Sequence, residues 1–452
     1  MAAESNSKRR RIVAEEDRIS SLPDCVLSHI LSFLPTKTSV ATSILSNRWR
    51  HIWKHVSVLD FSDDFRDESL FEKARRNNKL FEHFQNFSVF VNRVFSLRMP
   101  YPIEKMSLSC VKSLYNIESC TSSIDTWVCS VIGPHLKEFS LEIDPIQKYQ
   151  FEPPITLFTC TNLVSLSLIG ETGMLSSIYI DPRFAEEIRL PSLNYLKLHM
   201  NNVDIHTMNG FLVGCPILET LDTRLFGFNY NKLRVPSTLK RLKISSCSCL
   251  EMDLYSLGFD DLNTFSDVGN LQNVVKASLD VFRCSDGCYL ADILVNFFDD
   301  LSGIKHLSLS ISTIKLLLGD PVHLRFPEFR HLLHLELILP WFNQNSLLSL
   351  LHACPMLQVL IIQNDKKEST SPEWTAQSTV PNCILSHLTY IQFKGCEGFP
   401  DELLFAEYIL QNGLVLNKMS IADISVDILK YYILRRLSNV PRASRLCQLT
   451  FD

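Results

Sequence analysis

The chain has 452 residues and 46% of them are hydrophobic, enough to bury one extended core or two or three ordinary ones. Lysine and arginine number 44 against 49 aspartates and glutamates, so the formal net charge of −5 gives no electrostatic reason to expect a nucleic-acid partner. No apolar run reaches the roughly 18–20 residues of a membrane span, and no signal peptide opens the chain. With 14 cysteines and no secretory signal, we expect a reduced, intracellular protein of the nucleus, the cytoplasm or both, without a membrane partner.

Residues 1–16 are polar and basic and contain the run Lys8-Arg9-Arg10-Arg11. We expect this stretch to be a disordered tail. Four cations in a row permit two interpretations, a nuclear address or a solvated tail, and the sequence does not decide between them.

Residues 17–57 carry three short helical patterns. Ser21 and Asp24 fit a capping pattern for the first, in which apolar residues recur every three or four positions until a proline ends the helix. A second short helix is expected over 39–45, and Asn47 is expected to cap the third. The segment has more apolar surface than so short a module can bury, which predicts that a partner protein covers part of it. The alternative is that the module folds entirely against the rest of its own chain.

Residues 58–98 are interpreted as a cap and linker. The segment 56–61 alternates like a short strand, and phenylalanines and valines within 84–95 form one face of a helix. We expect this region to shield the edge of the repeats that follow and to set the angle of the helical module.

Residues 99–371 repeat the pattern L-x-x-L-x-L with some drift in residue type. Most neighbouring copies begin 21 to 31 residues apart, a spacing typical of leucine-rich repeats. Alternating apolar residues make a short strand with one buried face, and the next residues return the chain to start another strand beside it. We therefore predict an α/β solenoid with parallel strands inside and helices outside. Clear copies, the last of them beyond this region, begin at Leu136, Leu163, Leu193, Leu218, Leu239, Ile304, Leu332, Leu357 and Leu388.

Cysteines recur in register with these copies. Cys160, Cys215 and Cys354 each stand three positions before the first leucine of a copy, and Cys247 stands eight positions after one. At such turns a small side chain can satisfy a buried backbone group, so much of the cysteine content is explained as structure.

Other chemistry finds little support in the sequence. Cys247 and Cys249 with Cys284 and Cys288 could form a zinc site, but they lack the paired C-x-x-C or C…H spacing of such sites. No local signature pairs a histidine with a cysteine, and with 14 glycines no phosphate-binding glycine loop stands out. We expect no catalytic residue, no metal and no cofactor.

Three runs in the N-terminal module resemble the F-box of plant F-box proteins: Leu22-Pro23-Asp24, residues 30–35 and residues 42–50. The resemblance implies that this box docks on a Skp-type adaptor, and through it on a cullin. By position, the residues implied to contact the adaptor or to shape the contact surface are Leu22, Pro23, Val26, Leu27, Ile30, Leu31, Val40, Leu45 and Trp49.

Residues 372–452 resemble the FBD domain that follows leucine-rich repeats in plant F-box proteins, on residues 380–386, 393–395, 408–412 and 441–451. The pattern predicts a helix at 400–410, a strand at 417–421, a helix at 426–437 and a closing strand at 447–451. The resulting architecture is a three-helix F-box, a leucine-rich-repeat solenoid and an FBD segment that caps it.

This architecture implies a non-catalytic substrate-recognition subunit of an SCF-type cullin-RING ubiquitin ligase, whose arc binds an unknown target protein. Two alternatives remain: a small-molecule-dependent F-box receptor, as a resemblance to plant auxin receptors permits, and a repeat scaffold with no ligase role. A basic floor for a polyphosphate ligand would require more cations than the expected strand-face positions provide. Those positions are Glu138, Ser140, Ser165, Ser167, Asn194, Lys197, Lys240, Lys243, Lys305 and Glu336.

Overall fold

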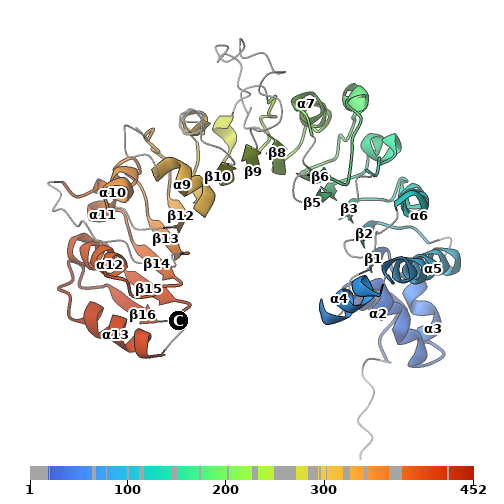
Figure 1. Ribbon diagram of the computed structural model, residues 1–452, viewed down its shortest axis with the longest axis horizontal. Coiled ribbons are helices and arrows are strands. Elements are labelled where there is room, and N and C mark those ends of the chain that lie inside the picture. The colour runs from blue at the N-terminus through green and yellow to red at the C-terminus, as the bar shows by residue number, and fades with distance from the viewer. Residues whose placement is uncertain are drawn as a thin grey trace, which may run out of the picture.

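The fold is taken from a computed structural model of the chain, and Figure 1 shows it as an arc of strands and helices. The predicted basic tail lies outside the residues it describes, as do Cys249, Cys284 and Cys288. The described residues are 19, 21–63, 68–77, 79–98, 101–110, 117–143, 150–172, 175–200, 203–226, 233–248, 271–283, 294, 297–301, 303–318, 326–340, 344–365, 379–424 and 427–451.

The N-terminal module has the three predicted helices, with different ends. Pro23 occupies the cap position of α1 with extended backbone and no side-chain cap, so the helix begins at Asp24 rather than behind a serine cap. The second helix begins at Thr36, before residue 39, because Pro35 has an extended ψ and occupies the cap position directly before it. The prediction that Asn47 caps the third helix is wrong: Arg48 holds that position and is already helical. The elements are α1 (Asp24–Leu31), α2 (Thr36–Ala41), η1 (Thr42–Ile44), α3 (Trp49–Ile52) and η2 (Trp53–His55).

A strand and two helices connect this module to the repeats: β1 (Val58–Ser62), α4 (Glu68–Arg76) and α5 (Leu80–Arg98). α5 is longer at both ends than the predicted helix because its buried face continues from Leu80 to Arg98. β1 is the first strand of the sheet and pairs in parallel with the next strand, so this segment lies at the N-terminal edge of the repeats.

The strands form one parallel sheet of 14 that curves into an arc (Figure 1). A separate antiparallel pair, β5 (Glu171–Thr172) and β6 (Leu175–Ser176), follows the fourth strand of this sheet along the chain. After β1 the sheet contains, in order, β2 (Lys105–Cys110), β3 (Glu138–Ile143), β4 (Ser165–Ile169), β7 (Tyr195–His199), β8 (Thr220–Phe226), β9 (Arg241–Ser248), β10 (Lys276–Arg283), β11 (His306–Leu309), β12 (His334–Leu339), β13 (Val359–Asn364), β14 (Tyr390–Lys394), β15 (Lys418–Ala422) and β16 (Gln448–Phe451).

Helices lie on the outer side of this arc and strands on the inner side, as predicted (Figure 1). The four C-terminal elements expected from the sequence are all present, each shifted by one or two residues at an end. The outer elements are α6 (Ile117–Val131), η3 (Ile155–Thr159), η4 (Pro182–Glu187), α7 (Ile205–Gly214), η7 (Leu271–Asn273), α9 (Ile311–Leu318), α10 (Gln344–His352), α11 (Asn382–Ser386), α12 (Pro400–Asn412) and α13 (Asp427–Ser438).

The leucines of successive repeats stack in register. Leu141 pairs with Leu168, which pairs with Leu198, and all three side chains are completely buried. Each such leucine contributes about 1.5–3 kcal/mol by leaving water, before conformational entropy is subtracted. A single unit cannot bury its own leucines, so the stack forms one continuous core.

A second stacking device runs along the backbone. One carbonyl at the entrance to each sheet strand from β1 to β14 accepts two N–H groups from the next repeat; the Glu104 carbonyl accepts from Lys137 at 2.8 Å and from Glu138 at 3.0 Å. We call this the shared-carbonyl ladder. Its acceptors are Ser57, Glu104, Lys137, Val164, Asn194, Glu219, Lys240, Val275, Lys305, Leu333, Gln358 and Thr389.

This ladder corrects one detail of the sequence analysis. Asn194, Lys240 and Lys305 were expected on the strand faces, but each lies one residue before its strand and supplies a shared carbonyl. The strand face begins at the next residue because pairing starts there.

Arg98 joins the helical module to the arc. Its side chain is 2% exposed and its Nη atoms donate to the carbonyls of Val56, Tyr101 and Pro102, the last two at 3.1 Å. Burial lowers the pKa of the guanidinium to about 10, which still leaves it protonated at neutral pH. A second link is the 2.8 Å bond from the Asp60 N–H to the Thr36 hydroxyl, between β1 and α2.

We predict that Arg98→Leu lowers the free energy of unfolding by about 1–3 kcal/mol, because buried carbonyls lose their donor. Urea unfolding followed by circular dichroism measures the change. Arg93→Leu, an exposed site on the same helix, is the control and should change stability by less than about 0.5 kcal/mol. Equal losses in the two variants would contradict the role assigned to Arg98.

Candidate functional site

Three different faces run along α1. Leu27 and Leu31 point into the chain and are 0% and 1% exposed. Val26 and Ile30, on the neighbouring face, are about two-fifths exposed, although both are apolar. The remaining face is polar and lines a pocket described below. The first helix therefore has more apolar surface than its own chain covers.

The exposed apolar face continues beyond the end of α1. Backbone bonds from Phe33 to Ile30 and from Leu34 to Leu31 continue the helical turn. Phe33 is 75% exposed, and its ring packs edge-on against His29 with centroids 5.0 Å apart. We name the exposed set the apolar strip; it consists of Pro23, Val26, Ile30, Phe33 and Leu34.

Two more exposed apolar residues precede α3. Ile44 and Leu45 are 85% and 64% exposed, while Trp49, four residues after Leu45, is buried. Val40 is partly buried and packs against the core. Arg48 fixes the approach of the two segments, since its Nε donates to Asp24 Oδ1 at 2.8 Å and its Nη2 donates to the Leu22 carbonyl.

The nine residues named from the sequence thus divide by exposure. Pro23, Val26, Ile30 and Leu45 are exposed and available to a partner. Leu22 and Val40 are partly buried, and Leu27, Leu31 and Trp49 lie in the core, a position that suits shaping the surface rather than touching a partner.

The sequence analysis did not identify four exposed apolar residues of this module as candidate contacts: Ile19, Phe33 and Ile44, which are 58%, 75% and 85% exposed, and Leu34, which is 36% exposed. Phe33 follows Ile30 by three residues and Val26 by seven, so the helical period could have identified it. Ile44 had no such signal, because its exposure depends on how η1 turns toward α3.

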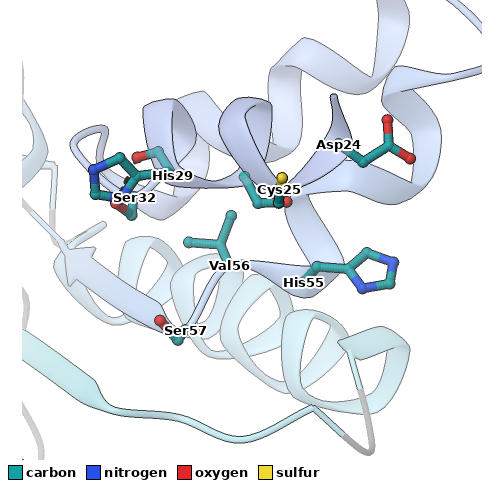
Figure 2. A pocket seen from close by; sticks show the side chains of 8 residues that line it. Asp24, Cys25, His29, Ser32, His55, Val56 and Ser57 are labelled. Atoms are coloured by element: carbon teal, nitrogen blue, oxygen red, sulfur yellow. Dashed lines mark hydrogen bonds between the residues drawn. The ribbon is translucent and has the colours of Figure 1, made fainter. Parts of the chain in front are cut away.

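Figure 2 shows the polar face of α1 against the segment that leads into β1. His29 and Ser32 lie at one end of this pocket and Asp24 and His55 at the other, so the titratable groups do not converge. The pocket has a volume of about 450 Å³ and is lined by Asp24, Cys25, Ser28, His29, Ser32, His55, Val56 and Ser57.

The described residues contain no group of three or more His, Cys, Asp or Glu side chains placed to hold a metal ion. In the same ranges, every helix is too short or too polar to traverse a bilayer. Two of the register cysteines are buried in the core: burial raises the pKa of Cys215 to about 12 and that of Cys354 well above its ordinary value.

The inner strand face mixes charges of both signs, as expected. Lys105 pairs with Glu138 at 2.7 Å across β2 and β3, and His199 lies 2.7 Å from Asp222. The pKa of Asp222 is lowered overall: burial acts to raise it, but the hydrogen bond and charge of His199 and the nearby lysines outweigh that effect.

A leucine-rich-repeat arc that continues from a three-helix module with an exposed apolar strip defines an F-box protein with leucine-rich repeats. Family models match three parts of the chain: the F-box domain at residues 19–61, the LRR repeats of FBD-associated F-box protein At5g56370 at 124–256, and FBD at 376–421.

Whole-length relatives from Arabidopsis thaliana agree with these matches. F-box/FBD/LRR-repeat protein At4g00160 is 30% identical over 99% of this chain and 97% of its own length. FBD-associated F-box protein At4g10400 is 30% identical over 96% of this chain and 100% of its own length. FBD-associated F-box protein At3g52670 is 29% identical over 98% of this chain and 99% of its own length. The chain belongs to the family of plant F-box/FBD/LRR-repeat proteins.

The cysteine environments predict selective alkylation. In the native protein iodoacetamide should modify Cys25, which is exposed, and spare Cys215, Cys354 and Cys383, which are buried with raised pKa values. Peptide mass spectrometry after short labelling measures this. The same labelling in urea is the control and should modify all four; native labelling of Cys215 at the rate of Cys25 would contradict the packing described.

Proposed function

We propose that this chain is the substrate-recognition subunit of an SCF-type cullin-RING ubiquitin ligase. The apolar strip supports this proposal most directly, since Val26, Ile30 and Phe33 lie exposed beside the buried core side chains Leu27 and Leu31 of the same helical module. A Skp-type adaptor would cover the strip and connect the chain to a cullin. Exposed patches of this kind mark protein interaction sites.

The chain would contribute position rather than chemistry. Holding a target lysine near a conjugating enzyme raises its effective concentration, which requires no catalytic group in the recognition subunit. We propose a nuclear or cytoplasmic location, where such complexes would meet their targets.

Two observations favour a protein target over the alternatives. Charges on the inner face occur in pairs such as Lys394 and Glu336, 3.7 Å apart, rather than as the basic floor that a polyphosphate ligand needs. The exposed strip argues against a scaffold whose helical module merely caps the arc, because a cap would bury that strip.

We also propose the domain limits 17–57 for the F-box, 58–98 for the cap, 99–371 for the repeats and 372–452 for the FBD segment. The F-box match at 19–61 overlaps the first of these segments, and the FBD match at 376–421 lies within the last. Because the shared-carbonyl ladder crosses residues 98 and 371, we regard these segments as functional units within one folding unit.

The decisive test is adaptor binding by a strip variant. Ile30→Glu places a charge at the centre of the strip and should weaken binding of a purified Skp-type adaptor at least about a hundredfold, because a charge buried at an interface without a partner costs several kcal/mol. Isothermal titration calorimetry measures the change.

Val89→Glu is the matched control, since Val89 is a 66% exposed apolar residue on α5 outside the F-box. Both variants should keep the wild-type melting temperature. Undiminished adaptor binding by Ile30→Glu would overturn the proposed docking surface.

A further inference from the structure

Among the described residues, the C-terminal tip of the arc exposes several large apolar side chains. A terminal repeat normally shields the stack with a polar outer face. α13, the last helix described, instead exposes Ile428 (82%), Tyr431 (66%) and Tyr432 (50%), and Leu446 before β16 is 76% exposed. Figure 1 shows α13 beside β16 at one tip of the arc and the F-box helices at the other.

These side chains form a second apolar face on a helix that already has a buried one. Ile433 and Leu437 of α13 are completely buried. Ile428, Tyr431 and Arg435 follow one another at spacings of three and four residues on the opposite side. The exposed face is therefore additional to the one that holds the helix on the sheet.

The same tip is basic, although the whole chain carries a net charge of −5. Between residues 428 and 451 the sequence contains no acidic residue. Arg435 and Arg445 are exposed, whereas Arg436 is paired with Glu407 of α12 at 2.5 Å. Tyrosine and arginine are the residue types most enriched among those that dominate binding energy at protein interfaces.

We propose that this surface binds an acidic, apolar segment of the target protein; the assignment of the partner as a target rests on the function proposed above. Apolar side chains of the segment would pack on the two tyrosines, and its carboxylates would pair with the arginines. We name the surface the tip face, and it consists of Ile428, Tyr431, Tyr432, Arg435 and Leu446.

Charge distinguishes this occupant from a second copy of the chain. A symmetric contact between two tip faces would bring equivalent surfaces together, and so would oppose Arg435 of one copy to the basic surface of the other. Like charges across an interface cost free energy, whereas carboxylates of a different protein relieve the repulsion.

The test uses the full chain bound to its adaptor and three fluorescein-labelled synthetic peptides. One peptide combines Leu and Phe with Glu, the second replaces every Glu by Lys, and the third replaces every Leu and Phe by Ser. Fluorescence anisotropy should show binding of the first peptide only, and the affinity should fall as salt is raised. The double substitution Ile428→Ser and Tyr431→Ser should weaken the affinity for the first peptide about tenfold or more, and Arg435→Glu should weaken it by a similar factor.

Val89→Ser removes an equally exposed apolar side chain at the opposite end of the arc and should leave the peptide affinity unchanged. Equal binding of all three peptides, or wild-type affinity in the α13 variants, would overturn the proposal. A dimer detected by sedimentation that Tyr431→Ser abolishes would also overturn it, by identifying a second copy as the occupant. Adaptor affinity measured on the same variants distinguishes this proposal from the proposed adaptor-docking function. A variant that loses peptide binding but keeps adaptor binding is affected at the tip face alone.

Discussion

The shared-carbonyl ladder is the constraint on which the rest of the structure depends. At each sheet strand from β2 to β15, a carbonyl of the preceding segment accepts two N–H groups, as the carbonyl of Glu104 does. These bonds accompany the register of the sheet strands from β1 to β15, and that register stacks leucines such as Leu141, Leu168 and Leu198. Because the first acceptor is Ser57, directly behind the F-box, the ladder also fixes where the F-box joins the arc.

Hydrogen bonds join the F-box to the arc, but part of the apolar surface of the F-box stays exposed. Arg98 and Thr36 tie its last turn and second helix to the backbone around β1. Those contacts use the buried side of the module, so the apolar strip is left on the free side.

The periodic features of the fold could be predicted from the sequence, whereas the residues at which individual helices and strands begin and end could not. The spacing of the leucines predicted the parallel arc, and the helical period at 400–410 predicted α12. Exposure within the F-box was harder to predict, because Leu27 and Ile30 belong to the same apolar pattern yet one is buried and the other exposed. Which side of an apolar helix faces its own chain is decided by tertiary contacts such as those of Arg48, and a one-dimensional pattern does not contain them.

The curvature of the continuous sheet has a geometric consequence. The apolar strip lies at one tip of the arc and the tip face at the other, so the separation of these two surfaces depends on the number of repeat units between them (Figure 1). Each inserted or deleted unit would change the distance and the angle between the two surfaces without altering either surface. Family members with different numbers of units could therefore hold the same pair of partners at different separations, so that unit number itself becomes a variable on which selection can act.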